Sequence, residues 1–140
     1  ENGLSEFISG EIPIGKVLHQ TTVRGLTLIP TGTLPPNPAE LLLHKRFTNC
    51  LSVLTPRYDH IIIDSPPILA VTDASIIGQM AGGTLMVLKA GEHPMREIEQ
   101  AVNRLQQADV NLRGIVFNDI DVSSRRYGAG RYSYHYTYKS

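Results

Sequence analysis

Three short apolar runs limit what this chain can fold into: residues 60–64, 84–88 and 114–118. Each is long enough for one strand and too short for a typical helix. Two segments between and beside these runs have helical signals, residues 73–80 and 94–108. In the second, apolar residues recur at helical spacing, namely Ile98, Ala101, Val102 and Leu105. Strands that alternate with helices predict an α/β fold with a mainly parallel sheet flanked by helices.

The first third of the chain has weaker signals. Residues 4–9 predict a short helix that Gly10 stops, and residues 26–30 predict a strand. Asn37-Pro38-Ala39-Glu40 is typical of a helix start, with Asn as N-cap, Pro at the first helical position and Glu at the third. We expect this helix to run to about Leu54.

Composition excludes several classes of protein. The 140 residues fit one domain, and 13 basic residues balance 13 acidic ones, so no general attraction to nucleic acid or anionic membrane is implied. The single Cys50 excludes an internal disulfide framework, and we expect it to pack in the core. No apolar run approaches the roughly 20 residues that span a bilayer. We therefore expect a cytosolic body, with any membrane contact made through a partner or another part of the protein.

The C-terminal residues differ sharply from the rest. Residues 125–140 contain no acidic residue and no Leu, Ile or Val, so we expect 123–140 to be a flexible tail outside a domain of residues 1–122. A phenol can accept a phosphoryl group, which adds about −1.5 to −2 charge at neutral pH. The alternatives are a solvated tail, an edge strand, or an aromatic and basic strand that stacks on RNA bases. Five of the six tyrosines lie here: Tyr127, Tyr132, Tyr134, Tyr136 and Tyr138.

The sharpest motif in the body is the run of residues 60–67, in which three isoleucines lead to Asp64. Its continuous apolar character predicts a parallel strand covered on both faces, with His60 packed or hydrogen-bonded. A carboxylate at the carboxyl end of such a strand lies where α/β sheets bind ligands, and Mg²⁺ is a natural partner for it. Pro66 and Pro67 stiffen the following turn. Alternatively, Asp64 only caps that turn.

Asn118 ends the last predicted strand. Its side-chain amide offers acceptor and donor groups in one plane, which suits the edge of a purine. The alternative is an Asx-turn residue that bonds its own backbone.

One segment imitates a phosphate-binding loop. Residues 10–17 match G-x-x-x-x-G-K, but Val17 has no hydroxyl for Mg²⁺ and Pro13 lacks a backbone N–H. The residues before Gly10 predict a helix instead of the buried strand that precedes a true loop. We reject this motif, so the chain has the metal side of a nucleotide site without the phosphate side.

Together these residues resemble the cytoplasmic kinase domain of bacterial tyrosine kinases of the capsule and exopolysaccharide type. The Asp64 strand alone would also suit septum-site and chromosome-partition ATPases. The resemblance runs nearly end to end. Its matching segments are residues 3–10, 28–32, 35–42, 58–67 and 116–118, together with the tyrosine cluster.

The resemblance implies a P-loop NTPase-like fold that uses ATP and Mg²⁺. It implies autophosphorylation of the tail tyrosines between neighbouring subunits of a homo-oligomeric ring. It assigns Asp64 to the metal and to catalysis, and Asn118, Pro66 and Pro67 to nucleotide binding. It also implies an inner-membrane activator or polysaccharide co-polymerase segment and a tyrosine phosphatase as partners. Such a kinase would regulate polysaccharide polymerisation and export from the cytoplasmic face of the inner membrane.

The main departure is that the family's Walker A loop and a second aspartate-bearing strand have no counterpart here. The missing strand would lie beside the Asp64 strand, so we expect unpaired apolar strand edges and weak or no ATP binding. Two other readings remain: a partition-type ATPase that makes no phosphotyrosine, and a non-catalytic interaction module. RNA binding is disfavoured by the neutral body.

Overall fold

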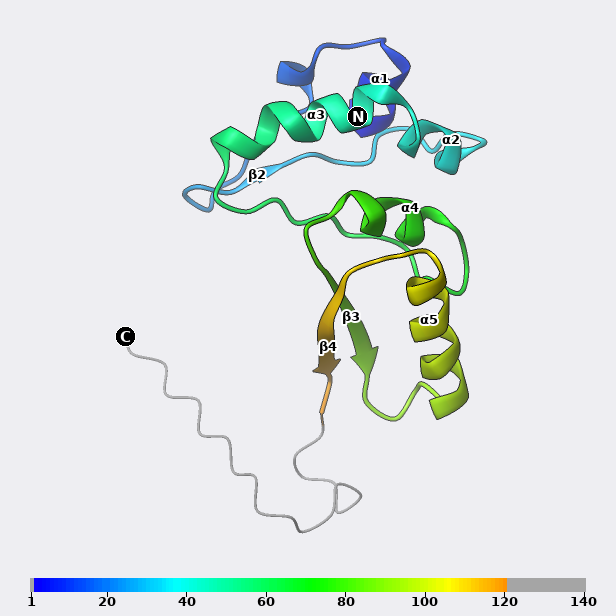
Figure 1. Cartoon of the computed structure of the whole chain (residues 1–140). Helices are drawn as coiled ribbons and strands as arrows, with labels where there is room; N and C mark the ends of the chain where they lie inside the picture. The colour runs from blue at the N-terminus through cyan, green and yellow to red at the C-terminus, as the bar shows by residue number, and fades with distance from the viewer. Residues whose placement is uncertain (1, 121–140) are drawn as a thin grey trace, which may run out of the picture.

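The computed structural model describes residues 2–120 and arranges them as two groups of elements (Figure 1). The N-terminal group contains α1 (Leu4–Ser9), the 3-10 helix η1 (Ile14–Lys16), β1 (His19–Gln20), β2 (Thr27–Leu28), α2 (Pro38–Leu42), α3 (Lys45–Leu54) and the 3-10 helix η2 (Thr55–Arg57). The C-terminal group contains α4 (Asp73–Met80), β3 (Thr84–Lys89), α5 (Met95–Gln107) and β4 (Leu112–Asn118). Helix α2 contacts α4 and so joins the two groups.

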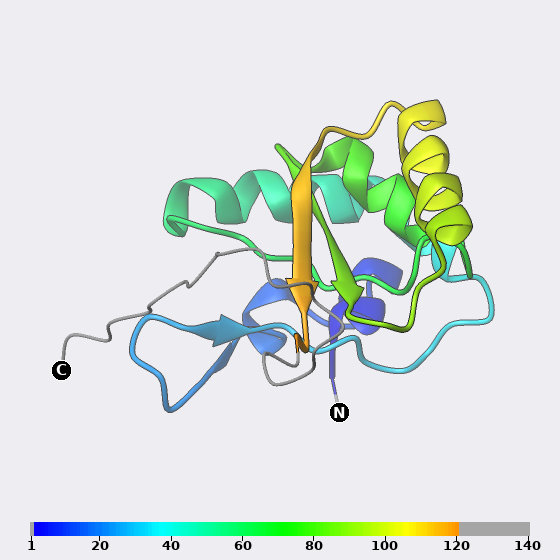
Figure 2. The same cartoon turned by 90° about the horizontal axis from the view of Figure 1, so that it is seen from below.

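The C-terminal group is built on one parallel strand pair. Strands β3 and β4 pair from Thr84 opposite Leu112 to Lys89 opposite Asn118, with an irregularity after Thr84. Helix α5 lies along one side of this pair (Figure 2). Because the strand period is two and the helix period is 3.6, alternate strand residues meet the apolar stripe of α5. The resulting core contains Met86, Leu88 and Ala101, with Ile68, Ile98, Val102 and Leu112 packed against it.

The opposite face of the same pair is bare. Leu85 is 62% exposed, Val87 is 61% exposed, and Val116 is 43% exposed. Parallel sheets normally have both faces covered. Residues 84–88 were expected to form a buried strand, and the strand exists, but burial is confined to the face that α5 covers.

The N-terminal group packs around α3. Phe47, Cys50 and Leu54 from this helix are buried, as are Ile8 of α1 and Val17. The prediction that Cys50 is a core residue is confirmed, and burial raises the pKa of its thiol. Within the described residues, no helix has the length and apolar character needed to cross a bilayer.

The single helix predicted over 37–54 is two helices. Asn37 is the N-cap and Pro38 the first helical residue, as predicted. The helix then ends at Leu42, because His44 takes an extended conformation and starts α3 instead. The ring Nδ1 of His44 accepts a hydrogen bond from the backbone N–H of Arg46 at 3.2 Å, which caps the new helix.

Two strand predictions also need correction. The strand predicted over 26–30 shrinks to two residues, which pair antiparallel with β1, a strand that the sequence did not predict. The strand predicted over 60–64 does not form: these residues lie outside every helix and strand, and Ile62 is 91% exposed. His60 is exposed rather than packed. A β-strand needs a neighbour for its backbone groups, and no described residue provides one for 60–64.

Candidate functional site

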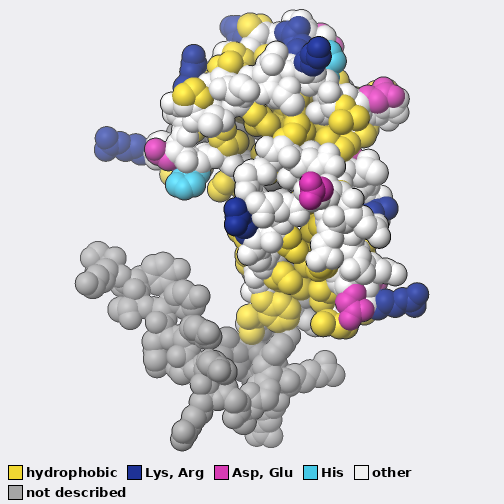
Figure 3. All heavy atoms as spheres, viewed as in Figure 1, with side chains coloured by type: hydrophobic (Ala, Val, Ile, Leu, Met, Phe, Trp, Pro, Cys, Tyr) yellow, Lys and Arg dark blue, Asp and Glu magenta, His cyan; other side chains and the backbone are white. Residues whose placement is uncertain are grey.

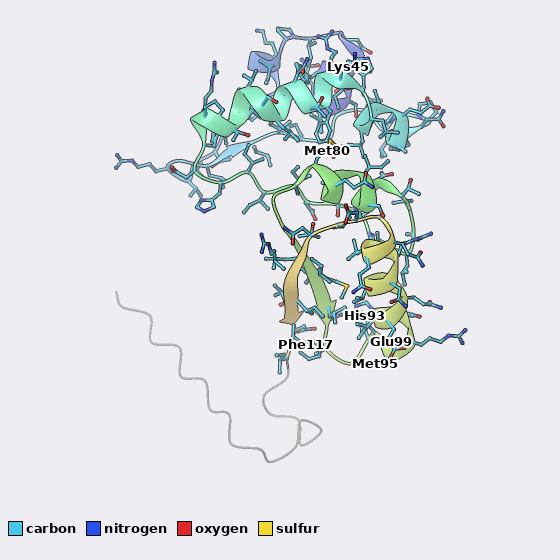
Figure 4. The ribbon with its side chains drawn as sticks, in the orientation of Figure 1. Lys45, Met80, His93, Met95, Glu99 and Phe117 are labelled. Carbon is cyan, nitrogen blue, oxygen red and sulfur yellow. The ribbon has the colours of Figure 1, made fainter. Side chains whose placement is uncertain are left out.

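The carboxyl ends of β3 and β4 meet at one edge of the sheet. Lys89 and Asn118 are register partners there, and the N–H of Ala90 donates to the carbonyl of Asn118 at 2.9 Å. Figure 4 labels Phe117 at this end of β4 and His93 in the turn that precedes α5. Ligands of parallel α/β sheets bind outside this edge. Asn118 is exposed there, as a nucleotide-contacting amide would need to be.

Lys89 is the charged centre of this edge. Its ammonium bonds the carboxylate of Glu92 and lies 3.9 Å from Oδ2 of Asp119. The hydrogen bond and charge of Glu92 raise the pKa of Lys89, and Lys89 in turn lowers the pKa of Glu92. Asp119 has a left-handed backbone with φ of 56°, which turns the chain sharply after β4. Lys89 therefore places a positive charge, partly offset by two carboxylates, beside Asn118.

Asp64 lies on a different segment, in the extended chain before α4. Its carboxylate is exposed and makes no hydrogen bond or ion pair with any residue between 2 and 120. The turn that follows is well anchored. The carbonyl of Pro67 accepts hydrogen bonds from the N–H groups of Ala70 and Val71, at 3.0 and 3.4 Å. A turn therefore follows the two prolines, as predicted.

A contact that the sequence did not predict ties this turn to the sheet. Nη1 of Arg104 in α5 donates to the carbonyl of Ile68 at 2.7 Å. The side chain of Ile68 also packs against the core beneath β3. The chain four residues after Asp64 is thus fixed to the C-terminal group.

The kind of metal ion that Asp64 could hold depends on how many other ligands the protein offers beside it. Within the described part of the chain, no group of three or more His, Cys, Asp or Glu residues is placed to hold a metal. Mg²⁺ commonly binds through one or two carboxylates while keeping waters and substrate phosphates as its other ligands. A single exposed carboxylate fits that mode and does not fit a cation held entirely by protein ligands.

The backbone hydrogen bonds of residues 10–17 exclude this segment as a phosphate-binding loop. Gly10 ends α1 with φ of 91°, and its N–H donates to the carbonyl of Phe7 at 3.1 Å. The N–H groups of Lys16 and Val17 donate to the carbonyls of Pro13 and Ile14, at 3.0 and 3.1 Å. These amides are occupied and cannot cradle a phosphate. Val17 itself is fully buried.

The side chain of Glu6 ties the loop at Thr33 to the start of α1, a contact that the sequence analysis missed. Its carboxylate accepts hydrogen bonds from the N–H groups of Gly3 and Thr33, both at 2.8 Å. These bonds, chiefly those from Thr33, lower the pKa of Glu6 from 4.5 to about 2. Ser5 strengthens the contact, since its Oγ donates to the carbonyl of Thr31 at 2.8 Å. The sequence signal that could have indicated this contact was a Glu three residues after a helix N-cap.

Comparison with known proteins supplies the family. No family model matches the chain. A Klebsiella pneumoniae relative, named as a tyrosine-protein kinase in the cps region, is 41% identical over 128 residues, which are 91% of this chain and 18% of that protein. The kinase domain of Escherichia coli tyrosine kinase ETK aligns with a TM-score of 0.84 and 36% identity, covering 97% of this chain and 52% of that one. The chain is homologous to bacterial tyrosine kinases. The BceF tyrosine kinase domain agrees, with a TM-score of 0.77, 50% identity, and coverage of 82% and 48%.

The lengths of these relatives limit what can be said of this chain's own activity. The chain spans about a fifth of the length of the Klebsiella relative and about half of the two solved kinase domains. The predicted arrangement of helices on a parallel sheet agrees with these domains. The tail tyrosines Tyr127, Tyr132, Tyr134, Tyr136 and Tyr138 lie outside the described residues.

Proposed function

We propose that this chain is part of an ATP-dependent protein-tyrosine autokinase that phosphorylates its own C-terminal tyrosines. The observation that carries this proposal is the homology to tyrosine-protein kinases over nearly the whole chain. The acceptors are the cluster of Tyr127, Tyr132, Tyr134, Tyr136 and Tyr138. A partition-type ATPase has no use for such a cluster, which favours the kinase.

Asp64 is the proposed metal-side residue. Its exposed carboxylate would hold Mg²⁺, and Mg²⁺–ATP would supply the transferable phosphoryl group, with the metal offsetting the phosphate charge. The Pro66–Pro67 turn, anchored through Ile68, keeps Asp64 in place. Asn118 presents its amide to the adenine at the carboxyl edge of β4. A phosphate cradle and the base for the tyrosine hydroxyl come from polypeptide beyond these 140 residues.

The proposed setting is a ring of kinase domains at the cytoplasmic face of the inner membrane. There the chain works with an activator or polysaccharide co-polymerase segment and with a tyrosine phosphatase, and it regulates capsular or exopolysaccharide polymerisation and export. The cps-region name of the Klebsiella relative supports this setting. Several phosphates would outweigh the four basic residues of the tail, which offers a charge switch for leaving the ring.

The test uses the full polypeptide that contains this chain. Asp64→Asn keeps the size of the side chain and removes its charge, so we expect at least a hundredfold loss of tail phosphotyrosine, measured by mass spectrometry. Asp59→Asn is the matched control, an exposed aspartate on the same segment that should leave phosphorylation unchanged. Unaltered phosphotyrosine in Asp64→Asn would refute the role of Asp64. ATP hydrolysis without phosphotyrosine in the unmutated protein would instead favour the partition-type ATPase, and neither activity would favour the interaction module.

A further inference from the structure

Tyr58 is the one tyrosine that lies within the described residues, since the other five belong to the tail. It directly follows η2 and has an extended backbone, with φ of −130° and ψ of 137°. The residue is partly buried, but its hydroxyl makes no hydrogen bond with any residue between 2 and 120. A buried tyrosine usually finds a partner for this hydroxyl. Within residues 2–120, the hydroxyl of Tyr58 therefore adds no hydrogen bond that a phenylalanine would lack.

The hydroxyl of Tyr58 reaches the surface of the described chain. Every buried side-chain nitrogen or oxygen among the described residues has a hydrogen-bond partner. Because the hydroxyl of Tyr58 has none, it is not one of the buried atoms. Tyr58 also lines an open depression of about 600 Å³ between the β1–β2 hairpin and residues 57–62. The residue is thus held by packing while its reactive oxygen stays accessible, which is what an acceptor of a transferred group needs.

The charged neighbours of Tyr58 suit a phosphate. Arg57 and His60 line the same depression, and Arg57 makes no ion pair with any residue between 2 and 120. Asp59 also lines it and is the opposing charge. Figure 3 shows basic, acidic and histidine side chains near one another at the left edge of the molecule, by β2. A guanidinium pairs well with a phosphate, so Arg57 offers a phosphorylated Tyr58 a partner that the unmodified residue does not use.

The position of Tyr58 decides which copy of the protein could modify it. Tyr58 and Asp64 lie six residues apart on a segment without helix or strand, which Figure 1 shows as extended chain. Six extended residues span up to about 20 Å, whereas reacting atoms must come within about 3–3.5 Å of each other. Tyr58 is therefore badly placed for a phosphoryl group held at the Asp64 of its own copy, and well placed for one held by another copy.

We propose that Tyr58 is a further phosphoacceptor, modified by a second copy of this protein. The phenolic oxygen of Tyr58 bonds to the γ-phosphorus of ATP while the bond from that phosphorus to the β–γ bridging oxygen breaks. ADP leaves, and the phenolic proton passes to a base or to water. This inference rests on the proposed kinase function. Its consequence is a charge of about −1.5 to −2 on the body of the chain, added independently of the tail.

The experiment incubates the purified full polypeptide that contains this chain with Mg²⁺ and ATP, and maps phosphotyrosine by mass spectrometry. Trypsin releases residues 58–89 as one peptide, in which Tyr58 is the only tyrosine. We expect phosphate on Tyr58 at a level at least about tenfold above that in Asp64→Asn. Replacing the five tail tyrosines with Phe should leave this signal in place. Tyr58→Phe is the matched variant, which keeps the ring and should retain tail phosphorylation.

A mixture of two copies tests the transfer between them. A tagged Asp64→Asn copy, inactive by itself, should gain phosphate on its Tyr58 when it is mixed with the unmutated copy. If the tagged copy stays unmodified while the unmutated copy is phosphorylated at Tyr58, transfer between copies is wrong.

Two further results would overturn the inference as a whole. Phosphorylated tail peptides with an unmodified 58–89 peptide would refute Tyr58 as an acceptor and leave the proposed kinase function standing. No phosphotyrosine anywhere in the unmutated polypeptide would refute both. The two failures are therefore told apart by the tail peptides of the same digest.

Discussion

Glu6 shows how one side chain sets the start of this fold. Its carboxylate receives N–H groups from Gly3 and Thr33, residues 30 positions apart in the chain, and so fastens the loop after Pro30 onto α1. The approach is close enough that a Cβ on Gly32 would lie 2.0 Å from Oε2 of Glu6. Gly32 also has φ of 83°, which a residue with a side chain rarely adopts. The contact therefore depends both on the carboxylate of Glu6 and on the absence of a side chain at Gly32.

The hydrogen bonds to Glu6 make the free energy of unfolding depend on pH in a defined direction. The pKa of Glu6 falls from 4.5 to about 2 on folding, so between these values the unfolded chain binds more protons and the folded state loses stability as pH falls. Glu6→Gln should be less stable than the unmutated chain at pH 7, and the difference should shrink between pH 4.5 and pH 2. Urea unfolding at pH 7, 4 and 3 measures this. Glu11→Gln, at an exposed site beyond α1, is the control, and parallel pH curves for Glu6→Gln and the unmutated chain would contradict the prediction.

Residues differ in how far the sequence predicts their roles. Cys50 was predicted correctly because burial follows from an apolar neighbourhood. The contact from Arg104 to the carbonyl of Ile68 joins residues 36 positions apart, and nothing in the local pattern encodes it. Asp64 was expected at the carboxyl end of a buried strand, but that strand does not form, so the proposed metal role of Asp64 stays a prediction.

At the scale of elements, predictions succeed where the signal is local. Helices α1, α4 and α5 and strands β3 and β4 follow their hydrophobic periods, although α4 takes Thr72 as N-cap and starts at Asp73. The run at 60–64 has an equally clear strand pattern and fails, because strand formation needs a neighbour as well as a pattern. The break between α2 and α3 was missed because the ring of His44 is an uncommon helix cap.

Packing between elements is tight where α4 meets the loop before β4. A Cβ on Gly78 would lie 2.6 Å from Cγ1 and 2.9 Å from Cγ2 of Val110, which is 7% exposed. Gly78→Ala should therefore destabilise the fold by about 1 to 2 kcal/mol, since overpacking of about 1–3 kcal/mol exceeds a gain in helix propensity of up to about 1 kcal/mol.

A second substitution, at Val110, tests whether its contact with residue 78 causes this loss of stability. In Val110→Ala the obstructing methyl groups are gone, so adding Gly78→Ala to that variant should cost about 1 kcal/mol less than in the unmutated chain. Thermal and urea unfolding of the four proteins in this cycle give the coupling energy. Gly82→Ala, which meets nothing within 4 Å, should change stability little. Additive effects of the two substitutions would show that the contact with Val110 is not the cause.

At the scale of the whole molecule, several apolar surfaces and candidate site residues of the described chain lack a neighbour. Strand β3 is buried on one face only, the run at 60–64 has no neighbouring strand among the described residues, and the candidate nucleotide residues Asp64 and Asn118 lie on separate segments. The sequence analysis expected unpaired apolar strand edges, and the exposed side chains of β3 and of residues 61 and 62 agree with that expectation. Fold class could be predicted because the alternation of helices and strands is a local pattern, whereas the roles of the candidate site residues could not, because residues 2–120 do not bring them together.

This organisation predicts the behaviour of chain 1–140 toward ATP. Most ATP affinity in such sites comes from backbone N–H groups and a lysine around the phosphates, and the only similar segment here spends its amides on a helix end and a 3-10 turn. The carboxylate of Asp64 favours Mg²⁺ but repels free phosphate. Calorimetric titration with ATP and Mg²⁺ should therefore show no binding with a dissociation constant in the micromolar range. Asp64→Asn should not change that result in chain 1–140, in contrast to the loss of phosphotyrosine that we expect for this substitution in the full polypeptide. Micromolar affinity for chain 1–140 would mean that these residues contain a phosphate site of their own, and the half-site account would be wrong.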